Sequence, residues 1–382
     1  MRSRKTRESP LTVAFIYDRK VEHIAHGESQ HEYADLSDDV TIGGITEALE
    51  RLGHRVVHVS GIKALVKDLA AHKHKHWDVV FNYSKGSHGT ARGTQVPALL
   101  EEYQIPFTFS DAETLTICGD KAKTKVFKCL ATMLFKLTRN YRWFWIITKS
   151  QRANMLWCPN TDDPFDYSEV HKKLSYPLFV KPTSSSQCNG ITAANKIVQE
   201  QDLQHEVEKL RSQFKDQEIL IENFLGGREF TVAISGTGEF ADVIGISELV
   251  WDTHLLRGRD KIHIDFTTEL SRRERCVNKG FTLENVPSSD PLWGEVVELG
   301  LKAYTALGCR DGGRVDIRLT SEEQGSAPCV IEVDPIFGMR PDRSRYALIA
   351  KSNEVAYHDL IQEFLDSAIQ RHEAMERGTV GI

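Results

Sequence analysis

Two carboxylates stand one residue apart in the apolar stretch VIEVDPIFGMRP, residues 330–341. Side chains on a β-strand alternate between its two faces, so a strand here would carry Glu332 and Asp334 on the same face. Two like charges at that spacing repel, and they are costly to remove from water unless a cation lies between them. The pattern therefore predicts a strand that faces a cation.

A second strand-like stretch, GRVDIRL at 313–319, carries Arg314 and Asp316 on one face in the same way. If the two stretches pair as antiparallel strands, three carboxylates and one guanidinium converge. Oxygen ligands without His or Cys among them are typical of Mg²⁺ sites. The alternative is a structural ion-pair network around Arg314, but three acids against one base would leave charge uncompensated. We therefore interpret Asp316, Glu332 and Asp334 as metal ligands.

Lys181 ends the apolar stretch PLFVKP and is followed by the small, polar loop TSSSQCNGI, residues 183–191. A lone lysine after a strand is usually a surface residue that keeps its charge in water. Followed by a loop of small residues that ends in glycine, it fits better as an anchor for phosphate beneath a cradle of backbone N–H groups. The stretch predicts a phosphate-binding lysine.

The stretch EILIENFLGGREFTVAI, residues 218–234, places Glu222 at the end of one strand and Glu229 at the start of the next. Phe224 and Leu225 lie between the two acids. Strand-end backbone beside an aromatic ring suits the edge of a purine, and Glu229 could accept hydrogen bonds from ribose hydroxyls. The alternative is a plain hairpin with two solvated acids.

Strand and helix signals alternate over the first hundred residues. Such alternation predicts βαβ units and a parallel sheet, whose ligands bind at the carboxyl ends of the strands. One of these ends continues into NYSKGSHGTARG, residues 82–93, where glycines would let backbone N–H groups approach an anion. The predicted elements are strands 13–17, 55–59 and 78–84, helices 41–54, 62–72 and 94–103, and an extended segment 105–110.

The second half of the chain predicts antiparallel strands and amphipathic helices instead. Residues 290–308 have helical spacing of apolar side chains, and Gly308 lies where a helix would end. Residues 138–163 fit neither pattern, because they hold three of the six Trp with no clear caps. We interpret 138–163 as an atypical insert, and 138–158 as a translated intron or a mis-joined exon. The other predicted elements are a helical region 111–137, strands 176–182, 218–225, 228–235, 312–319 and 329–335, and helices 200–214 and 356–372.

The composition of the 382-residue chain is that of a globular protein, with 40% hydrophobic and 27% charged residues. A net charge of −6 gives no electrostatic reason to expect nucleic acid or an anionic membrane as partner. Seven scattered cysteines and a basic N-terminus without an apolar run favour reduced thiols and a cytoplasmic location. The run HKHKH, residues 72–76, is interpreted as solvated surface because its lysines would repel a metal.

These stretches, in this order, resemble the ATP-grasp superfamily and, within it, the D-alanine–D-alanine ligase family. The resemblance covers most of the chain outside 1–10, 129–163 and about 250–290. It implies an α/β chain, α+β in its ATP-binding part, in which an N-terminal doubly wound parallel sheet precedes the ATP-grasp fold. The motifs that carry it are NYSKG, GTQVPALLEEYQIPFTFSDAETLTICGDKAKTK, VKP, ILIENFLGGREFTVAI, GCRDGGRVDIRL and VIEVDPIFGM.

The resemblance also implies ATP and Mg²⁺ (or Mn²⁺) as cofactors and a role for each motif residue. Arg314 would stabilise the negative charge that develops on the reacting phosphoryl and acyl groups. The implied contacts are Lys121 and Lys181 with the ATP phosphates, Glu222, Asn223, Phe224 and Leu225 with adenine, Glu229 with ribose, Asp316, Glu332 and Asp334 with the metal, and Gly338 and Met339 with the acceptor substrate.

Three departures from the family pattern affect the expected substrate. Asp334 stands where the family usually has Asn, and Gln187 and Cys188 replace a pair of serines. Residues 250–270 lack the Lys–Tyr pair of the family's active-site loop. We therefore expect retained ATP chemistry with a different, bulkier amino-acid-like carboxylate. The alternative is that D-alanine remains the substrate and that the missing contacts come from Arg257, Arg259 or Lys261.

The implied reaction joins a carboxylate to an amine through an acyl phosphate, with amino-acid-like small molecules as substrates. Two alternatives stay open: an ATP-grasp ligase of other amino acids in secondary metabolism, and a catalytically inactive nucleotide-binding relative. The sequence leaves open whether the chain forms a homodimer. The predicted domains are a Rossmann-like substrate domain at 1–110, a central ATP-grasp subdomain at 111–240 and a C-terminal catalytic subdomain at 241–382.

Overall fold

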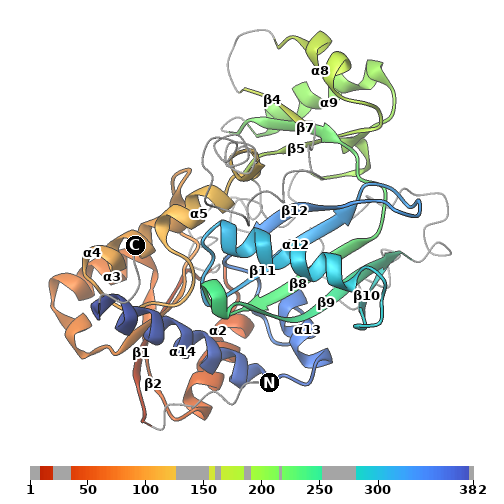
Figure 1. The fold of residues 1–382 in the computed structure, drawn as a ribbon. Helices are drawn as coiled ribbons and strands as arrows, with labels where there is room; N and C mark the ends of the chain where they lie inside the picture. The colour runs from red at the N-terminus through yellow and green to blue at the C-terminus, as the bar shows by residue number, and fades with distance from the viewer. Residues whose placement is uncertain are drawn as a thin grey trace.

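The computed structural model describes residues 9–19, 36–125, 155–159, 165–184, 191–214, 217–251 and 281–377. The described residues form three β-sheets, arranged as Figure 1 shows. Among their helices, none is both long and apolar enough to span a bilayer. Gln187 and Cys188 lie outside the described residues, as do residues 252–270 of the stretch 250–270 that lacks the Lys–Tyr pair. Residues 138–154 and 160–163 of the predicted insert also lie outside them.

The N-terminal sheet is parallel, which confirms the prediction from alternating strand and helix signals. Its strands follow the order β2-β1-β3, and residues 13–16 of the middle strand are fully buried. A strand covered on both faces needs no polar alternation, so it appears in the sequence as a continuous apolar run. The elements are β1 (Thr12–Tyr17), α2 (Asp39–Arg51), β2 (Arg55–Ser60), α3 (Gly61–Ala70), η1 (Lys73–His76), β3 (Val79–Tyr83), η2 (Arg92–Thr94), α4 (Gln95–Glu102) and α5 (Ala112–Cys118).

A four-stranded antiparallel sheet follows in the order β4-β7-β5-β6. Two helices pack against it around a core of its own, in the part of the molecule at the top of Figure 1. Its first strand covers 155–158, so the last four residues of the stretch 138–158, which lies within the predicted insert, belong to the sheet. The elements are β4 (Met155–Cys158), α8 (Tyr167–Lys173), β5 (Leu178–Pro182), η3 (Ala193–Asn195), β6 (Lys196–Ile197), α9 (Glu200–Gln213) and β7 (Ile219–Asn223).

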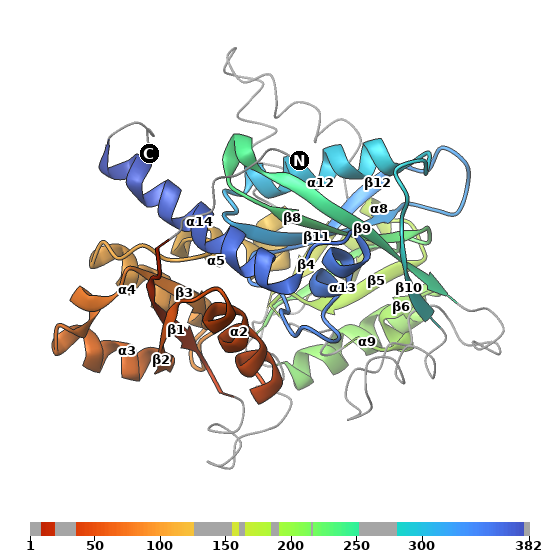
Figure 2. The same cartoon turned by 90° about the horizontal axis from the view of Figure 1, so that it is seen from below.

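A five-stranded antiparallel sheet in the order β10-β9-β8-β11-β12 forms the rest of the molecule. One face packs on α12, and the side chains of Val232, Val315 and Val333 lie in the core between them. The opposite face packs in part against α13 (Figure 2). The elements are β8 (Glu229–Ser235), η4 (Gly238–Phe240), β9 (Asp242–Trp251), β10 (Phe281–Asn285), α12 (Trp293–Ala306), β11 (Gly312–Leu319), β12 (Pro328–Asp334), α13 (Arg345–Ser352) and α14 (Tyr357–Glu376).

The sheets divide the chain differently from the predicted domain ranges. Strands β8 and β9 are neighbours in one sheet, so the predicted boundary at 240/241 lies between two paired strands. The C-terminal helix α14 packs on α2 and β3 of the N-terminal sheet and shares their core. Figures 1 and 2 both show α14 beside that sheet. The three domain ranges stay a prediction.

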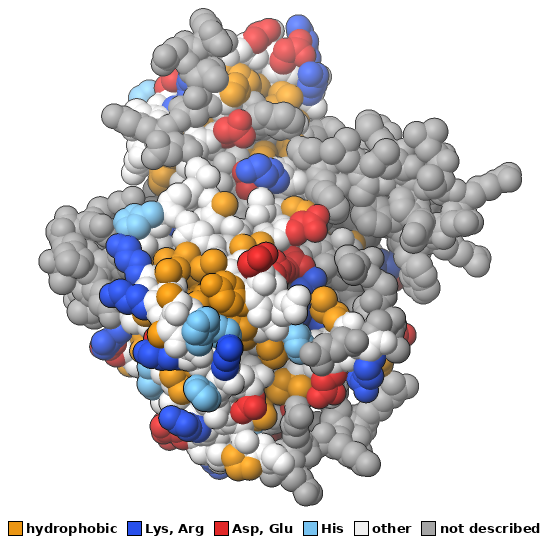
Figure 3. Space-filling model, turned by 90° about the vertical axis from the view of Figure 1, so that its left-hand side faces the viewer, with side chains coloured by type: hydrophobic (Ala, Val, Ile, Leu, Met, Phe, Trp, Pro, Cys, Tyr) orange, Lys and Arg blue, Asp and Glu red, His pale blue; other side chains and the backbone are white. Residues whose placement is uncertain are grey.

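Figure 3 shows the face on the left of Figure 1, where hydrophobic, Lys and His side chains lie next to one another. Val66 of α3 and Tyr103 just after α4 are among the exposed hydrophobic side chains. The run 72–76 is mostly exposed, as predicted for a solvated surface. Among the described residues no group of three His, Cys, Asp or Glu could hold a metal.

Candidate active site

Strands β11 and β12 pair as predicted, and their register brings four charged side chains together. Arg314 is opposite Asp334, and Asp316 is opposite Glu332. Because Val315 of β11 lies in the core beneath α12, its two neighbours Arg314 and Asp316 point to the other side of the sheet. We call the side that carries these four residues the acid-bearing face.

Arg314 lies between two of the carboxylates. Its Nε atom is 3.1 Å from Asp334 Oδ2, and its Nη1 atom is 3.0 Å from Asp316 Oδ2. Lys121 supplies a second cation, with its Nζ atom 3.6 Å from Glu332 Oε1. The prediction that Arg314 is the only base was wrong, because Lys121 comes from a distant part of the chain. With Lys121 present, uncompensated charge is no longer a reason to prefer a metal site over an ion-pair network around Arg314. The predicted convergence itself is present.

The surroundings shift the pKa values of these groups in different directions. Burial alone would raise the pKa of Glu332, but Lys121, Arg314 and Lys181 outweigh it and lower that pKa. Burial raises the pKa of Asp334, and Arg314 and Lys85 oppose this only in part. Of these two carboxylates, Glu332 is therefore the one that is better stabilised in its charged form.

The pKa of Arg314 moves upward. Burial would lower it, but Asp316, Asp334 and Glu332 outweigh the burial. Arg314 therefore stays positively charged in this site. That charge is needed for the role implied by the resemblance, the stabilisation of developing negative charge.

The four-stranded sheet contributes a separate ion-pair cluster. Lys181 at the end of β5 is buried, and its Nζ atom is 2.6 Å from Glu222 Oε1 on the neighbouring strand β7. Lys125 contacts the other oxygen of the same carboxylate. Glu222 is thus held by two lysines, rather than being a solvated acid at a hairpin. Sequence reasoning missed Lys125, although it lies in the GDKAKTK motif four residues after Lys121.

The segment between β7 and β8 links the two sheets. Phe224 donates its backbone N–H to Pro177 O at 2.9 Å, and Asn223 donates its side-chain N–H to Ser175 O at 2.7 Å. A Cβ atom on Gly227 would lie 2.2 Å from the backbone oxygen of Ser321, so only glycine fits at this crossing. The predicted adenine-binding segment is therefore a close-packed connection, and Leu225 lies at its centre.

Glu229 opens β8 and lies in the five-stranded sheet. Its Oε2 atom is 3.4 Å from Arg318 Nη1 on β11, and its Oε1 atom is 3.9 Å from Arg345 Nη1 on α13. The side chain is largely buried. It is therefore a second acid that is partnered rather than solvated, and it belongs to a different sheet from Glu222.

The turn after β12 is tied to the N-terminal sheet. Tyr83 at the end of β3 donates its hydroxyl to Phe337 O and accepts a hydrogen bond from Met339 N, both at 3.0 Å. The backbone oxygen of Met339 accepts from Tyr357 Oη at 2.7 Å, and its side chain lies in the core. Gly338 is exposed, so it is the residue of this predicted pair that a substrate can reach.

The glycine-bearing loop after β3 binds an anion, and that anion is the protein's own. Asp18 Oδ2 accepts hydrogen bonds from Ser84 Oγ at 2.6 Å and from the backbone N–H groups of Lys85 and Gly86 at 2.8 Å. Gly86 has a φ of +67°, which favours glycine. The loop thereby holds Lys85 at the carboxyl end of the sheet, near Asp334.

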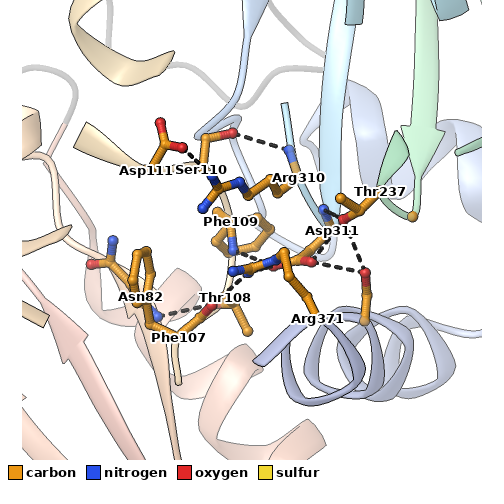
Figure 4. Close-up of polar contacts among 12 residues, drawn as sticks. Asn82, Phe107, Thr108, Phe109, Ser110, Asp111, Thr237, Arg310, Asp311 and Arg371 are labelled. Carbon is orange, nitrogen blue, oxygen red and sulfur yellow. Dashed lines mark hydrogen bonds and ion pairs between the residues drawn. The ribbon is translucent and has the colours of Figure 1, made fainter. Parts of the chain in front are cut away.

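A buried carboxylate, Asp311, anchors the chain at the start of β11 (Figure 4). Its Oδ2 atom accepts from Phe109 N and Arg371 Nη2, both at 2.8 Å. Its Oδ1 atom accepts from Ser367 Oγ at 2.8 Å and Thr237 Oγ1 at 3.1 Å. These donors come from the N-terminal part, from α14 and from the loop after β8. The strand that carries the catalytic candidates is thus tied to three other regions.

Comparisons with known proteins identify the family to which the chain belongs. The family model for the D-ala D-ala ligase C-terminus matches residues 157–366, more than half of the chain. The D-alanine–D-alanine ligase of Halalkalibacterium halodurans is 27% identical over 331 residues, which cover 86% of this chain and 93% of that protein. The vancomycin/teicoplanin A-type resistance protein VanA of Enterococcus faecium is 27% identical over 316 residues, 80% of this chain and 77% of that protein.

Solved structures show the same fold. The D-alanine–D-alanine ligase of Bacillus anthracis complexed with ATP has a TM-score of 0.64 at 19% identity, with 96% of this chain and 99% of that chain covered. The VanG D-Ala:D-Ser ligase of Enterococcus faecalis has a TM-score of 0.63 at 16% identity, with 94% of this chain and 100% of that chain covered. The resemblance inferred from the motifs is confirmed: the chain belongs to the D-alanine–D-alanine ligase family and has its ATP-grasp fold.

Proposed function

We propose that the chain is an ATP- and Mg²⁺-dependent ligase that joins a carboxylate to an amine through an acyl phosphate. The observation that carries the proposal is the ion pair of Lys121 with Glu332, at 3.6 Å. Lys121 donates its backbone N–H to Thr183 O, just beyond β5, so the pair links the four-stranded sheet to the acid-bearing face. A nucleotide bound between the two sheets would meet cations from both.

The charge count supports a metal ion that enters with the nucleotide. Four cations and four carboxylates form the two ion-pair clusters: Lys121, Lys125, Lys181 and Arg314 against Glu222, Asp316, Glu332 and Asp334. These eight groups balance, and Lys85 near Asp334 adds one further positive charge. A triphosphate carries more negative charge than that, so it has to bring counter-charge with it. Mg²⁺ does so, since it needs only one or two protein carboxylates when phosphate oxygens fill its other positions.

The donor set fits Mg²⁺ in chemistry. All three candidate ligands, Asp316, Glu332 and Asp334, are carboxylates on one face of two paired strands. In the described part of the chain their oxygens face Arg314 and Lys121 and do not form a ready three-ligand group. When bound there, the metal would neutralise charge on the phosphates and hold them in line for attack. Movement of Lys121 and Arg314 from these acids to phosphate oxygens would release carboxylate oxygens for the ion.

Different residues serve the two steps of the reaction, acyl-phosphate formation and amide formation. In the first, a substrate carboxylate oxygen bonds to the γ-phosphorus while the bond to the β-phosphate oxygen breaks and ADP leaves. Arg314 stabilises charge on the transferring group, and Lys121 and Lys181 hold the phosphates. In the second, the amine attacks the acyl carbon, loses a proton, and inorganic phosphate leaves. Gly338, exposed after β12, is placed to contact the acceptor.

For the nucleotide itself, we propose that adenine lies against the connection between β7 and β8. Phe224 uses its backbone N–H within the fold, at 2.9 Å from Pro177 O, so the backbone at Asn223 and Leu225 would provide the adenine contacts. Glu229 would accept from the ribose hydroxyls. Glu222, which is bound to two lysines, would then fix Lys181 in place rather than contact adenine itself.

The substrate is proposed to be an amino-acid-like carboxylate other than D-alanine. Asp334 adds a charge to the site, and Lys85 of the N-terminal sheet lies close enough to oppose the rise of its pKa. The VanG D-Ala:D-Ser ligase of Enterococcus faecalis, which has a similar fold, is named for a substrate pair other than two D-alanines. Sites built around polar groups discriminate strongly, by roughly 10⁴ or more, against substrates that leave those groups unpaired.

Release of ADP, followed with a coupled assay across D- and L-amino acids and small hydroxy acids, tests the proposal. Turnover with an amino acid other than D-alanine is the expected result. Efficient synthesis of D-alanyl-D-alanine at millimolar substrate would overturn the substrate assignment but keep the ligase. Binding of MgADP without turnover on any substrate would favour the catalytically inactive relative. The alternative of an amino-acid ligase of secondary metabolism differs only in which substrate the panel identifies.

A further inference from the structure

Arg345, the first residue of α13, lies on the acid-bearing face without a role in the proposed reaction. Its side chain is 10% exposed, and its Nη1 atom donates to Thr231 Oγ1 at 3.1 Å. The carboxylate of Glu229 is 3.9 Å away and also pairs with Arg318 at 3.4 Å. Two half-buried guanidinium groups therefore share one carboxylate, although Arg318 also donates to Gly227 O and lies over the Phe224 ring. A buried positive charge in excess is costly unless a further anion joins it.

Ser247 of β9 is a second unexplained polar group on the same face. It is the cross-strand neighbour of Thr231, so both side chains point to the acid-bearing side of the sheet. Ser247 is only 7% exposed, and its Oγ atom has no hydrogen-bond partner within the part of the chain that the structure describes. A buried hydroxyl without a partner carries a desolvation cost, which a ligand oxygen would relieve.

The position of Arg345 is set by the packing of its helix. A Cβ atom on Gly245 of β9 would lie 2.2 Å from Asn353 Nδ2 and 3.0 Å from Ile349 Cγ2, so α13 approaches the sheet closely there. Tyr346 also donates its hydroxyl to Ile234 O at 2.9 Å. These contacts hold α13 on the sheet independently of the guanidinium of Arg345.

We propose that Arg345 and Ser247 form an anion subsite that takes phosphate or carboxylate oxygens of the bound ligand. Thr231 lies between them: it accepts from Arg345 and donates to Asp316 Oδ1 at 2.8 Å. The subsite is therefore next to a proposed metal ligand, where a phosphate of the nucleotide or the carboxylate of the amino-acid substrate would lie. The guanidinium fork matches either group. The proposal rests on the proposed function.

Three variants test the subsite by equilibrium binding of MgADP and by thermal unfolding. Ser247→Ala removes a hydroxyl that makes no hydrogen bond to any of the described residues, so its melting temperature should equal or exceed that of the wild type. If Ser247 is structural only, ligand affinity should not change. If it binds the ligand, affinity should fall several-fold. Arg345→Gln should weaken binding by roughly ten- to a hundredfold, the effect of a lost charge-assisted hydrogen bond, and Arg345→Lys should restore part of it.

Lys351→Gln is the matched control, because it removes a positive charge from the exposed side of the same helix. Its affinity and turnover should equal those of the wild type. Weaker MgADP binding in Arg345→Gln and Ser247→Ala, but not in this control, identifies a phosphate as the ligand group. Unchanged MgADP binding with a raised KM for the amino acid found in the substrate panel identifies the carboxylate.

Folded Arg345→Gln and Ser247→Ala variants with unchanged MgADP affinity and unchanged KM would overturn the subsite while leaving the ligase intact. A wild-type protein that neither binds MgADP nor releases ADP would instead refute the proposed function. The subsite is then tested with pyrophosphate alone as the probe. Protection of the wild type but not of Arg345→Gln against thermal unfolding would support it, and equal behaviour of the two proteins would refute it.

Discussion

Glu222 and Glu332 are both strand carboxylates with lysine partners, yet their surroundings differ. Glu222, in the four-stranded sheet, is 10% exposed and is held by Lys125 and by Lys181 at 2.6 Å. Glu332, in the five-stranded sheet, is 31% exposed, and the Nζ atom of Lys121 lies 3.6 Å from its carboxylate. The first carboxylate is closed off by its partners, whereas the second retains access to a ligand. Residue type alone does not separate a structural acid from a binding one.

The largest expected effect comes from Glu332→Gln. Removal of this charge should lower turnover by at least about a hundredfold, because a metal ligand stabilises charge on the transferring group by several kcal/mol. The unfolding free energy should change by less than about 1 kcal/mol, since the side chain is partly exposed. Steady-state ADP release and urea unfolding measure the two quantities. Glu323→Gln, on the exposed loop between the same two strands, is the control and should leave turnover unchanged. If the Glu332→Gln variant keeps turnover within threefold of the wild type, the metal assignment is contradicted.

Glu222→Gln, in contrast to Glu332→Gln, should mainly lower stability. Loss of its charge leaves Lys125 and Lys181 buried without their carboxylate, which should lower the unfolding free energy by about 3 kcal/mol. Urea unfolding measures the loss, with Glu208→Gln on the solvent side of α9 as a comparison for an exposed ion pair. If Glu222→Gln is as stable as the wild type, the distinction drawn between the two acids fails.

A comparison of Lys121→Met with Lys181→Met distinguishes a lysine that binds phosphate from one that also stabilises the fold. Lys121 is proposed to bind phosphate, and its ion pair with Glu332 is long, so the affinity for MgADP should fall about tenfold while stability stays within about 1 kcal/mol. Lys181→Met should reduce both the affinity for MgADP and the unfolding free energy, because Lys181 also neutralises Glu222. Calorimetric titration with MgADP and urea unfolding of the two variants provide the comparison. Equal losses of stability would show that both lysines are structural.

The smallest effect is expected at Asp38, which caps α2, accepts a hydrogen bond from Arg340 and lies outside both ion-pair clusters. Burial alone would raise the pKa of Asp38, but hydrogen bonds from Thr41 and Arg340 outweigh it and hold the pKa below 3.8. A lowered pKa means that the stabilisation is present above pH 3.8 and is lost as the pH falls through the lowered value. Asp38→Asn should therefore cost about 0.5–1 kcal/mol at pH 7, discounted for partial exposure. The cost should shrink in acid, and a cost independent of pH would contradict the ion-pair explanation.

Much of the fold could be predicted because its signals are local. The parallel order of the first strands, the helix capped by Asp38 and the pairing of β11 with β12 each follow from patterns within a few residues. The division into sheets was less accessible, because β8 could have paired with β7 as a hairpin. The close crossing at Gly227 sends it into the other sheet instead.

The candidate site was predicted in part for the same reason. The motif residues lie on the strands that the sequence predicts, but several residues that contact them or complete the site were missed. Asp18 follows a buried strand, which was a usable signal. Lys85 lies in the NYSKG motif at the end of a predicted strand, which was also a usable signal. Ser247 and Arg345 have no such signal, because nothing in their neighbouring residues distinguishes them from surface residues. Their roles depend on which strand or helix lies opposite.

The sequence by itself determined that Glu332 and Asp334, like Arg314 and Asp316, share one face of a strand, because the two-residue alternation of a strand holds in any fold. Only the tertiary structure decided what those faces meet. Lys121 reaches Glu332, and Arg345 reaches Thr231, across more than a hundred residues of chain. Such distances are set by how sheets and helices pack. Charge balance, pKa shifts and the proposed anion subsite all depend on that packing.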